Sequence, residues 1–181
     1  GADRYETAVL LSQAGFPNGA PAVVLATGEN FPDALVGAPL AAAYGGPLLL
    51  TTPSSLPTKV VAELRRLQPR TVFLVGLPSA LVAKVRAVLT DLPAGQPVLL
   101  TGRDRYQTAW SVAKVIQAKL GTISGVVIAP GDRFPDGLAA ASLAASKGWP
   151  IVLTPTGGPF PQVSRDAITQ LGVTSGIEVG T

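Results

Sequence analysis

Two short blocks that combine charged and aromatic residues occur twice in the chain. DRYETA at residues 3–8 returns as DRYQTA at residues 104–109, and FPDAL at residues 31–35 returns as FPDGL at residues 134–138. The first block carries a guanidinium and a phenol, and the second carries a carboxylate, so the two can pair with each other or contact a ligand. These repeated residues are therefore the first candidates for a binding site.

Each block is expected where a strand ends and a helix begins. The carboxyl ends of parallel strands share one sheet edge, the usual place for a ligand in open α/β folds. We therefore predict Arg4 within ion-pair reach of Asp33, and Arg105 within reach of Asp136. Two interpretations stay open: the residues clasp the loops, with the aspartates favoured at positive helix ends, or they contact a ligand. The candidate ligand contacts are Arg4, Tyr5, Asp33, Arg105, Tyr106 and Asp136.

The residue types argue against the common catalytic sites. The chain contains no His and no Cys, so the usual nucleophile–base pairs and zinc sites cannot be assembled. The loop before each Phe-Pro-Asp block has a single glycine. It therefore matches neither of the phosphate-binding motifs G-x-G-x-x-G and G-x-x-x-x-G-K-[ST]. A carboxylate pair, Asp33 with Glu29 or Asp136 with Asp132, could serve acid–base chemistry, but local helix capping explains both. We therefore predict that the protein is not an enzyme and uses no cofactor. The alternative is a Rossmann-like enzyme that acts on a nucleotide or sugar phosphate.

Positive charge is concentrated in residues 53–90. Six basic residues there accompany Glu63 alone, a local charge of +5 (6 − 1), which leaves −2 for the rest of a chain with net charge +3. Such a surface can attract an acidic polymer, and Arg65, Arg66 and Arg70 are candidate contacts. The alternative is two ordinary solvated helix surfaces. The few aromatic residues are too scattered to form a stacking platform for neutral sugars or nucleic acid, so no nucleic-acid partner is expected.

Short apolar runs bounded by Gly and Pro alternate with helical patterns, which is typical of strands buried on both faces of a parallel sheet. The fold class predicted is α/β, with tandem Rossmann-like or flavodoxin-like units, each a mainly parallel sheet flanked by helices. The expected strands are 23–26, 48–50, 72–75, 98–100, 126–129, 151–153 and 177–179, and the expected helices are 7–14, 33–44, 59–67, 79–89, 108–120, 138–147 and 162–171.

The predicted helices at 33–44 and 137–147 are rich in Ala, Gly, Ser and Leu and lack a polar face. A helix that is apolar all round is buried on more than one side. We therefore expect one side to face its own sheet and the other a neighbouring copy, with Leu35, Leu40, Leu138 and Leu143 in an interface between copies or chains. The apolar stretch 31–50 is interrupted by an Asp and by Gly and Pro, so no membrane span is predicted.

The repetition extends over nearly the whole chain. The blocks return at offsets of about 101 and 103 residues, and PLLLT at 47–51 returns as PIVLT at 150–154. A period near 100 exceeds that of a solenoid and suits a small α/β unit with its own core. We divide the chain into repeats 1–97 and 98–181. The second stops before an equivalent of helix 79–89, and we expect it to be C-terminally incomplete.

These ordered blocks resemble the type-2 cell wall-binding repeats of bacterial surface proteins and wall-lytic enzymes. That family has an Arg-Tyr-x-Thr-Ala block, a strand, a Phe-Pro-Asp-Ala-Leu block and then Pro-[Ile/Leu]-Leu-Leu; here Gly137 and the residues 151–153 depart from the pattern. The resemblance implies an extracellular place at the cell wall or cell surface. It implies non-covalent binding to an anionic cell-wall polysaccharide or teichoic-acid-like polymer, which anchors an attached surface or wall-lytic protein.

The resemblance also implies three copies around a common axis. Self-association, or packing with a third repeat, is therefore expected for a chain that carries fewer than three. The remaining alternative is a purely structural assembly unit that packs through its small-residue helices and binds no polymer.

Overall fold

Helices and strands alternate along the chain in the computed structural model, which describes residues 1–180 without the side chain of Phe134. The helices are α1 (Arg4–Gly15), α2 (Phe31–Ala43), α3 (Thr58–Leu67), α4 (Ser79–Leu89), α5 (Arg105–Leu120), α6 (Phe134–Lys147) and α7 (Gln162–Leu171). The strands are β1 (Ala22–Thr27), β2 (Leu48–Thr51), β3 (Thr71–Val75), β4 (Val98–Leu100), β5 (Gly125–Pro130), β6 (Ile151–Thr154) and β7 (Ser175–Glu178).

The strands form two parallel sheets. Sheet A has the order β2-β1-β3-β4, and sheet B has the order β6-β5-β7. Val24 pairs with Leu48 in sheet A, and Val127 pairs with Ile151 in sheet B. Both residues of the second pair lie 103 positions after their equivalents in the first pair. The two copies therefore share strand order and register, and the predicted tandem α/β architecture is confirmed.

The helices that open the two copies begin earlier than the sequence prediction placed them. The Asp3 carboxylate accepts a hydrogen bond from the Glu6 amide at 2.7 Å, and the Asp104 carboxylate accepts one from the Gln107 amide at 2.8 Å. An aspartate at this position caps free N–H groups of the first turn. The helices thus begin at the Arg of each repeated block rather than at the Thr.

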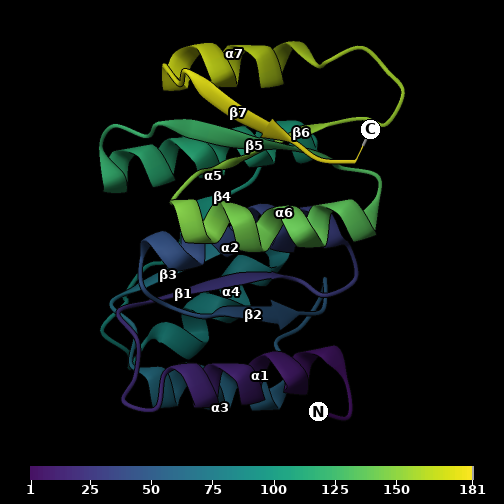
Figure 1. Cartoon of the computed structure of the whole chain (residues 1–181). Coiled ribbons are helices and arrows are strands. Elements are labelled where there is room, and N and C mark those ends of the chain that lie inside the picture. Colours follow the sequence, from purple (N-terminus) through teal and green to yellow (C-terminus); the bar gives the residue numbers. More distant parts are fainter. Residues whose placement is uncertain (181) are drawn as a thin grey trace.

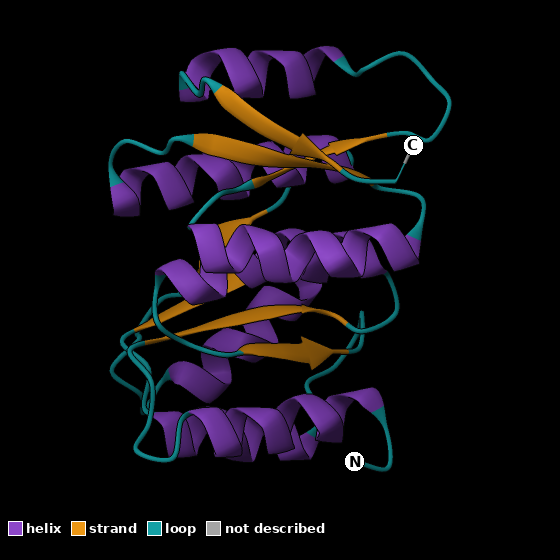
Figure 2. Cartoon of the chain, viewed as in Figure 1, coloured by secondary structure: helices purple, strands orange, loops and turns teal. Residues whose placement is uncertain are grey.

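The elements stack in layers (Figures 1 and 2). Helices α1, α3 and α4 cover the outer face of sheet A, where they share one apolar core with the strands. Helices α2 and α6 lie between the two sheets, and α7 covers the outer face of sheet B. Helix α5 belongs to two cores: Ala113 packs in the outer core of sheet B, whereas Val112 and Ile116 pack in the core between the copies.

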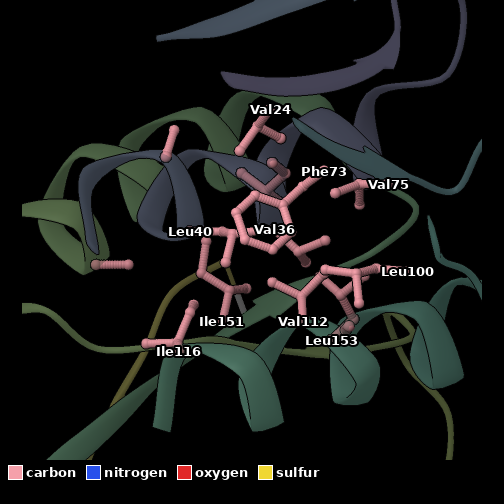
Figure 3. Packing of buried hydrophobic residues seen from close by; sticks show 14 of the residues in the cluster. Val24, Val36, Leu40, Phe73, Val75, Leu100, Val112, Ile116, Ile151 and Leu153 are labelled. Carbon is pink, nitrogen blue, oxygen red and sulfur yellow. The ribbon is translucent and has the colours of Figure 1, made fainter. Parts of the chain in front are cut away.

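The core between the copies draws on both repeats, as Figure 3 shows. Val24, Leu40 and Phe73 of the first copy meet Val112 and Ile151 of the second in one continuous apolar cluster. All five are almost completely buried. The two sheets are therefore held in a single body by a shared hydrophobic interior.

The small-residue helices pack against each other as predicted. Leu35 and Leu40 are buried in the shared core, and Leu143 packs against it. A Cβ at Gly137 would lie 2.8 Å from Leu35 Cδ2, so the glycine that departs from the family pattern makes room for that leucine. Leu138 differs from the other three, because 58% of it is exposed.

Strand β4 extends sheet A. It pairs in parallel with β3, with Val75 opposite Leu100, although the predicted boundary assigns residues 98–100 to the second repeat. The division at 97/98 stays a prediction about sequence repeats, since a repeat and a sheet need not end at the same residue. Within residues 1–180, no helix has the length and apolar character needed to cross a membrane.

Candidate ligand-binding surfaces

Arg4 and Arg105 play the same part in the two copies. The Arg4 guanidinium donates a hydrogen bond to the Gly28 carbonyl, and the Arg105 guanidinium donates one to the Gly131 carbonyl. Each arginine thereby fastens the start of a helix to the loop after the neighbouring strand. The predicted ion pairs, Arg4 with Asp33 and Arg105 with Asp136, are wrong: neither forms among the described residues.

Asp33 faces the second copy rather than Arg4. It is 7% exposed, and burial raises the pKa of its carboxyl to about 6, a rise that the positive charge of Arg105 partly opposes. Gly76 lies directly beneath the carboxylate with φ +63°, and any side chain there would collide with it. The motif residue of one copy is thus electrostatically coupled to the motif residue of the other.

Asp136, the equivalent residue of the second copy, has a different environment. It is half-buried, and its carboxylate lies 3.6 Å from the Arg133 guanidinium nitrogen Nε. Gly180 lies beneath it as Gly76 lies beneath Asp33. The position of Arg133 is occupied by Asn30 in the first copy, 103 residues earlier. The second copy therefore has a cation beside its aspartate on the same loop, where the first copy has a neutral amide.

A polar cavity of about 280 Å³ opens at the junction of the copies, where Asp33 and Arg105 meet. We call it the junction cavity. It lies at the carboxyl edge of sheet A, between the N-terminal turns of α2 and α5. Its lining residues are Asn30, Asp33, Gly76, Thr101, Gly102, Asp104, Arg105 and Thr108.

The two motif tyrosines are mainly packing residues. Tyr106 packs against the shared core, and its pKa is raised chiefly by burial. Tyr5 is half-buried and covers Gly28, where a Cβ would lie 2.8 Å from Tyr5 Cε1. Both rings therefore have a structural function, and a ligand role for either remains a prediction.

Of the carboxylates considered for acid–base chemistry, Asp132 is engaged in hydrogen bonds with Thr156 on another loop. The Thr156 hydroxyl and amide donate to the Asp132 carboxylate at 2.7 and 3.0 Å, and these bonds lower the pKa of Asp132. Asp132 therefore ties two loops at the carboxyl edge of sheet B. Among the described residues, no group of three or more acidic residues is placed to hold a metal ion.

Some of the basic side chains in residues 53–90 are already engaged by hydrogen bonds or ion pairs within the protein. Lys59 pairs with Glu6, and Lys84 Nζ donates to the Ser54 carbonyl at 2.6 Å. Arg65, Arg70 and Arg86 are exposed, and within residues 1–180 their side chains make no hydrogen bond or ion pair. These three residues, which we call the basic surface, lie near the amino edge of sheet A, because α3 and α4 run back toward the starts of β3 and β4. The predicted contacts of the first copy thus separate into two regions, one at the carboxyl edge and one at the amino edge of sheet A.

Arg66 belongs to an internal network that the sequence analysis missed. Its Nη2 donates to Glu63 Oε1 at 2.7 Å and to the Phe16 carbonyl at 2.9 Å, and Ser12 Oγ donates to Glu63 at 2.5 Å. Burial acts to raise the pKa of Glu63, but the bonds from Arg66 and Ser12 lower it overall. An acidic residue on the apolar side of a helix, one turn before Arg66, was the available signal.

An apolar surface is open on the first copy, along α1 and the edge strand β2. Leu11 is 69% exposed and lines a hollow of about 570 Å³ together with Ala8 and Leu48. The equivalent of Leu11 in the second copy is Val112, which is 1% exposed because it packs in the shared core. We call this surface the open α1 face. A smaller apolar hollow of about 210 Å³ lies beside the exposed Leu138 of α6.

Comparison with known proteins gives the family. The sequence profile described as Cell wall binding domain 2 matches residues 1–86 and 99–177, which is nearly all of both copies. The chain is 31% identical over 154 residues to an amidase enhancer of Bacillus subtilis, covering 85% of this chain and 21% of that protein. It is 30% identical over 180 residues to the N-acetylmuramoyl-L-alanine amidase LytC of the same species, covering 99% of this chain and 35% of the relative.

Solved structures show the same architecture. Cwp6 from Clostridium difficile superposes with a TM-score of 0.87 at 28% sequence identity, over 98% of this chain and 28% of that one. Cwp8 from the same species gives a TM-score of 0.84 at 26% identity, over 100% of this chain and 30% of that one. The chain therefore spans between about a fifth and about a third of the length of these proteins.

Proposed function

The chain belongs to the cell wall binding domain 2 family, and from this premise we propose that it binds an anionic polymer of the bacterial cell wall and anchors a larger protein there. Its place at the cell wall follows from the family and from its cell wall relatives. The observation that carries the proposal is that the family profile matches both copies, residues 1–86 and 99–177. Because the relatives are several times longer, we propose that any catalytic activity resides outside this module.

The basic surface supports an anionic partner. Arg65, Arg70 and Arg86 present guanidinium groups that within residues 1–180 have no acidic partner. Such groups attract repeated phosphates or carboxylates with little geometric demand. Individual contacts of this kind are weak, but a polymer offers many equivalent sites to one protein. Tandem copies then gain from effective concentration after the first contact.

The open α1 face supports packing with a further repeat. In the second copy the equivalent helix, α5, packs on α2 of the first copy and buries Val112. By the same geometry, α1 would pack on the α2-equivalent helix of another repeat, and α6 would receive an α1-equivalent helix. A contact of this kind between unlike faces can close into a ring. We propose that the module is completed by a further repeat of the family.

A sedimentation assay with purified walls tests the wall-binding proposal. The protein is mixed with intact walls, and with walls from which the anionic polymer has been extracted, over a series of salt concentrations. We expect binding only to intact walls, and we expect it to weaken as the screening length falls from about 10 Å at 0.1 M salt to about 3 Å at 1 M. The double variant Arg65→Glu/Arg70→Glu should bind less than the wild type.

The matched control is Lys114→Glu/Lys147→Glu, which makes the same change of net charge at two exposed residues of α5 and α6 in the second copy. Arg66 is left unchanged because it supports Glu63. Equal sedimentation with intact and extracted walls would remove the anionic polymer as the partner. If both double variants bind equally, charge at the basic surface is not responsible.

A further inference from the structure

The Asp33 side chain is 7% exposed and lines the junction cavity, and its carboxylate accepts no hydrogen bond from the other described residues. The amide of the adjacent Gly76 is used elsewhere, since it donates to the Leu100 carbonyl at 2.9 Å. Arg105 is close enough to act on Asp33 through its charge, but its hydrogen bond goes to the Gly131 carbonyl. The carboxylate lines the junction cavity, so its acceptor sites point to a ligand that enters the cavity and supplies donors.

The comparison between copies shows that this arrangement is not required by the fold. In the second copy, Arg133 stands beside Asp136 and pairs with it. In the first copy, the shorter and neutral Asn30 stands in the same place and lines the junction cavity. The change from Arg to Asn removes the local cation and leaves space in front of the carboxylate.

The composition of the cavity favours hydroxyl groups over a phosphate. Two carboxylates, Asp33 and Asp104, accompany one guanidinium, Arg105, so the lining carries a net negative charge. Asn30 and Thr101 add groups that both donate and accept. Neighbouring hydroxyls on a sugar ring can donate to a carboxylate while accepting from a guanidinium or amide. The volume of about 280 Å³ is at the small end of the range of about 300–1,000 Å³ for ligand pockets, which suits one sugar ring.

We infer that the junction cavity binds a single sugar residue of the wall polymer through its hydroxyl groups, with Asp33 as the central acceptor. The inference rests on the proposed function, because the wall polymer supplies the sugar. Recognition is by hydrogen bonds rather than by aromatic stacking. The basic surface at the opposite edge of sheet A binds the anionic groups of the polymer, and the junction cavity recognises one of its sugar residues.

The walls of the cavity are held in place before any ligand binds. The Gly102 amide donates to Thr108 Oγ1 at 3.0 Å, and the Arg103 amide donates to the Gln107 side-chain oxygen at 3.1 Å. These bonds fix the loop between β4 and α5 against the first turn of α5. A rigid site loses little conformational entropy on binding, which favours a small and polar ligand.

Titration followed by amide NMR tests the inference. The probes are neutral oligosaccharides released from purified walls with aqueous hydrogen fluoride, which cleaves phosphodiester bonds, and, separately, inorganic phosphate. In the wild type, the oligosaccharides should shift the amide signals of Asn30, Gly76 and Gly102, and phosphate should not. Asp33→Asn and Asn30→Arg should each weaken oligosaccharide binding about tenfold or more, the effect of losing a hydrogen bond to a charged group. The control Asp91→Asn, on an exposed residue after α4, should bind as the wild type.

Stability and wall sedimentation of the same variants separate the possible outcomes. Asp33→Asn should be at least as stable as the wild type at neutral pH, so its loss of binding cannot be attributed to unfolding. The inference is overturned if phosphate alone shifts the cavity signals, if neither probe does, or if both variants retain full affinity. Intact walls that still retain the protein in those cases would leave the proposed wall-binding function standing. Oligosaccharide binding without wall retention would support the cavity and contradict the anchoring function.

Discussion

Asp33 makes the stability of the protein depend on pH in an unusual direction for a carboxyl group. Its pKa is raised from the ordinary 3.8 to about 6, so the folded state favours the protonated form. The contribution of Asp33 to the free energy of unfolding is therefore most favourable below about pH 4 and falls as pH rises through 6. A difference of about 2 between the folded and unfolded pKa corresponds to about 3 kcal/mol at neutral pH.

We expect Asp33→Asn to raise the free energy of unfolding at pH 7 by up to about 3 kcal/mol, because the buried charge is removed. At pH 4.5 the variant and the wild type should differ much less. Urea unfolding at the two pH values measures both quantities. A variant that is less stable than the wild type at pH 7 would show that the ionised carboxylate is satisfied in the folded protein.

The Glu63 network gives a second prediction at single residues. Arg66→Ala should lower the free energy of unfolding by about 3 kcal/mol, because it removes the cation from a buried charge. The second copy has Ala113 and Ala167 at the positions of Ser12 and Glu63, so Ser12→Ala/Glu63→Ala copies a pair that the fold already accepts. We expect this double variant to cost less than Arg66→Ala in urea unfolding. The reverse order would mean that the network itself stabilises the first copy.

At the scale of elements, local sequence patterns identified the layout well. The apolar runs bounded by Gly and Pro gave the strands, and the alternation with helices gave the parallel sheets. The starts of α1 and α5 were placed too late. The aspartates that cap them, Asp3 and Asp104, are the signal in the sequence that would have located both starts. The electrostatic influence of Arg105 on Asp33 could not be predicted, because the two residues come from different copies. Such a contact depends on how the two sheets pack, and no local pattern records that.

The α2–α6 contact provides the prediction for an element. Gly137→Val should lower the free energy of unfolding by about 2 kcal/mol, because a branched side chain would be forced against the buried Leu35. Gly137→Ala should stay within about 1 kcal/mol of the wild type, since the gain in helix propensity offsets a small shift of Leu35. The matched control is Ala34→Val, the same position in α2, which lines an open hollow. Equal losses for the two valine variants would indicate a general cost of valine in these helices.

For the whole molecule, the difference between the copies lies in one uncovered apolar surface on the first copy. The shared core buries the α5 face of the second copy on the first, and the open α1 face presents the equivalent apolar surface to solvent. An exposed apolar surface next to hollows of this size usually marks an interaction site. Because α1 and α6 lie on different copies, one chain can offer α1 while its neighbour offers α6.

We therefore expect the protein to self-associate with increasing concentration, as measured by light scattering and sedimentation velocity. Leu11→Arg should shift the population toward the monomer, because it places a charge in a contact that is apolar in the second copy, where Val112 is buried. Leu10→Arg is the matched control: Leu10 is on the same helix and 49% exposed, but it faces the hollow between α1 and α3. Leu138→Arg, on the opposite face, should have the effect of Leu11→Arg. A strict monomer at all concentrations, or equal effects of Leu10→Arg and Leu11→Arg, would contradict completion of the module through the open α1 face.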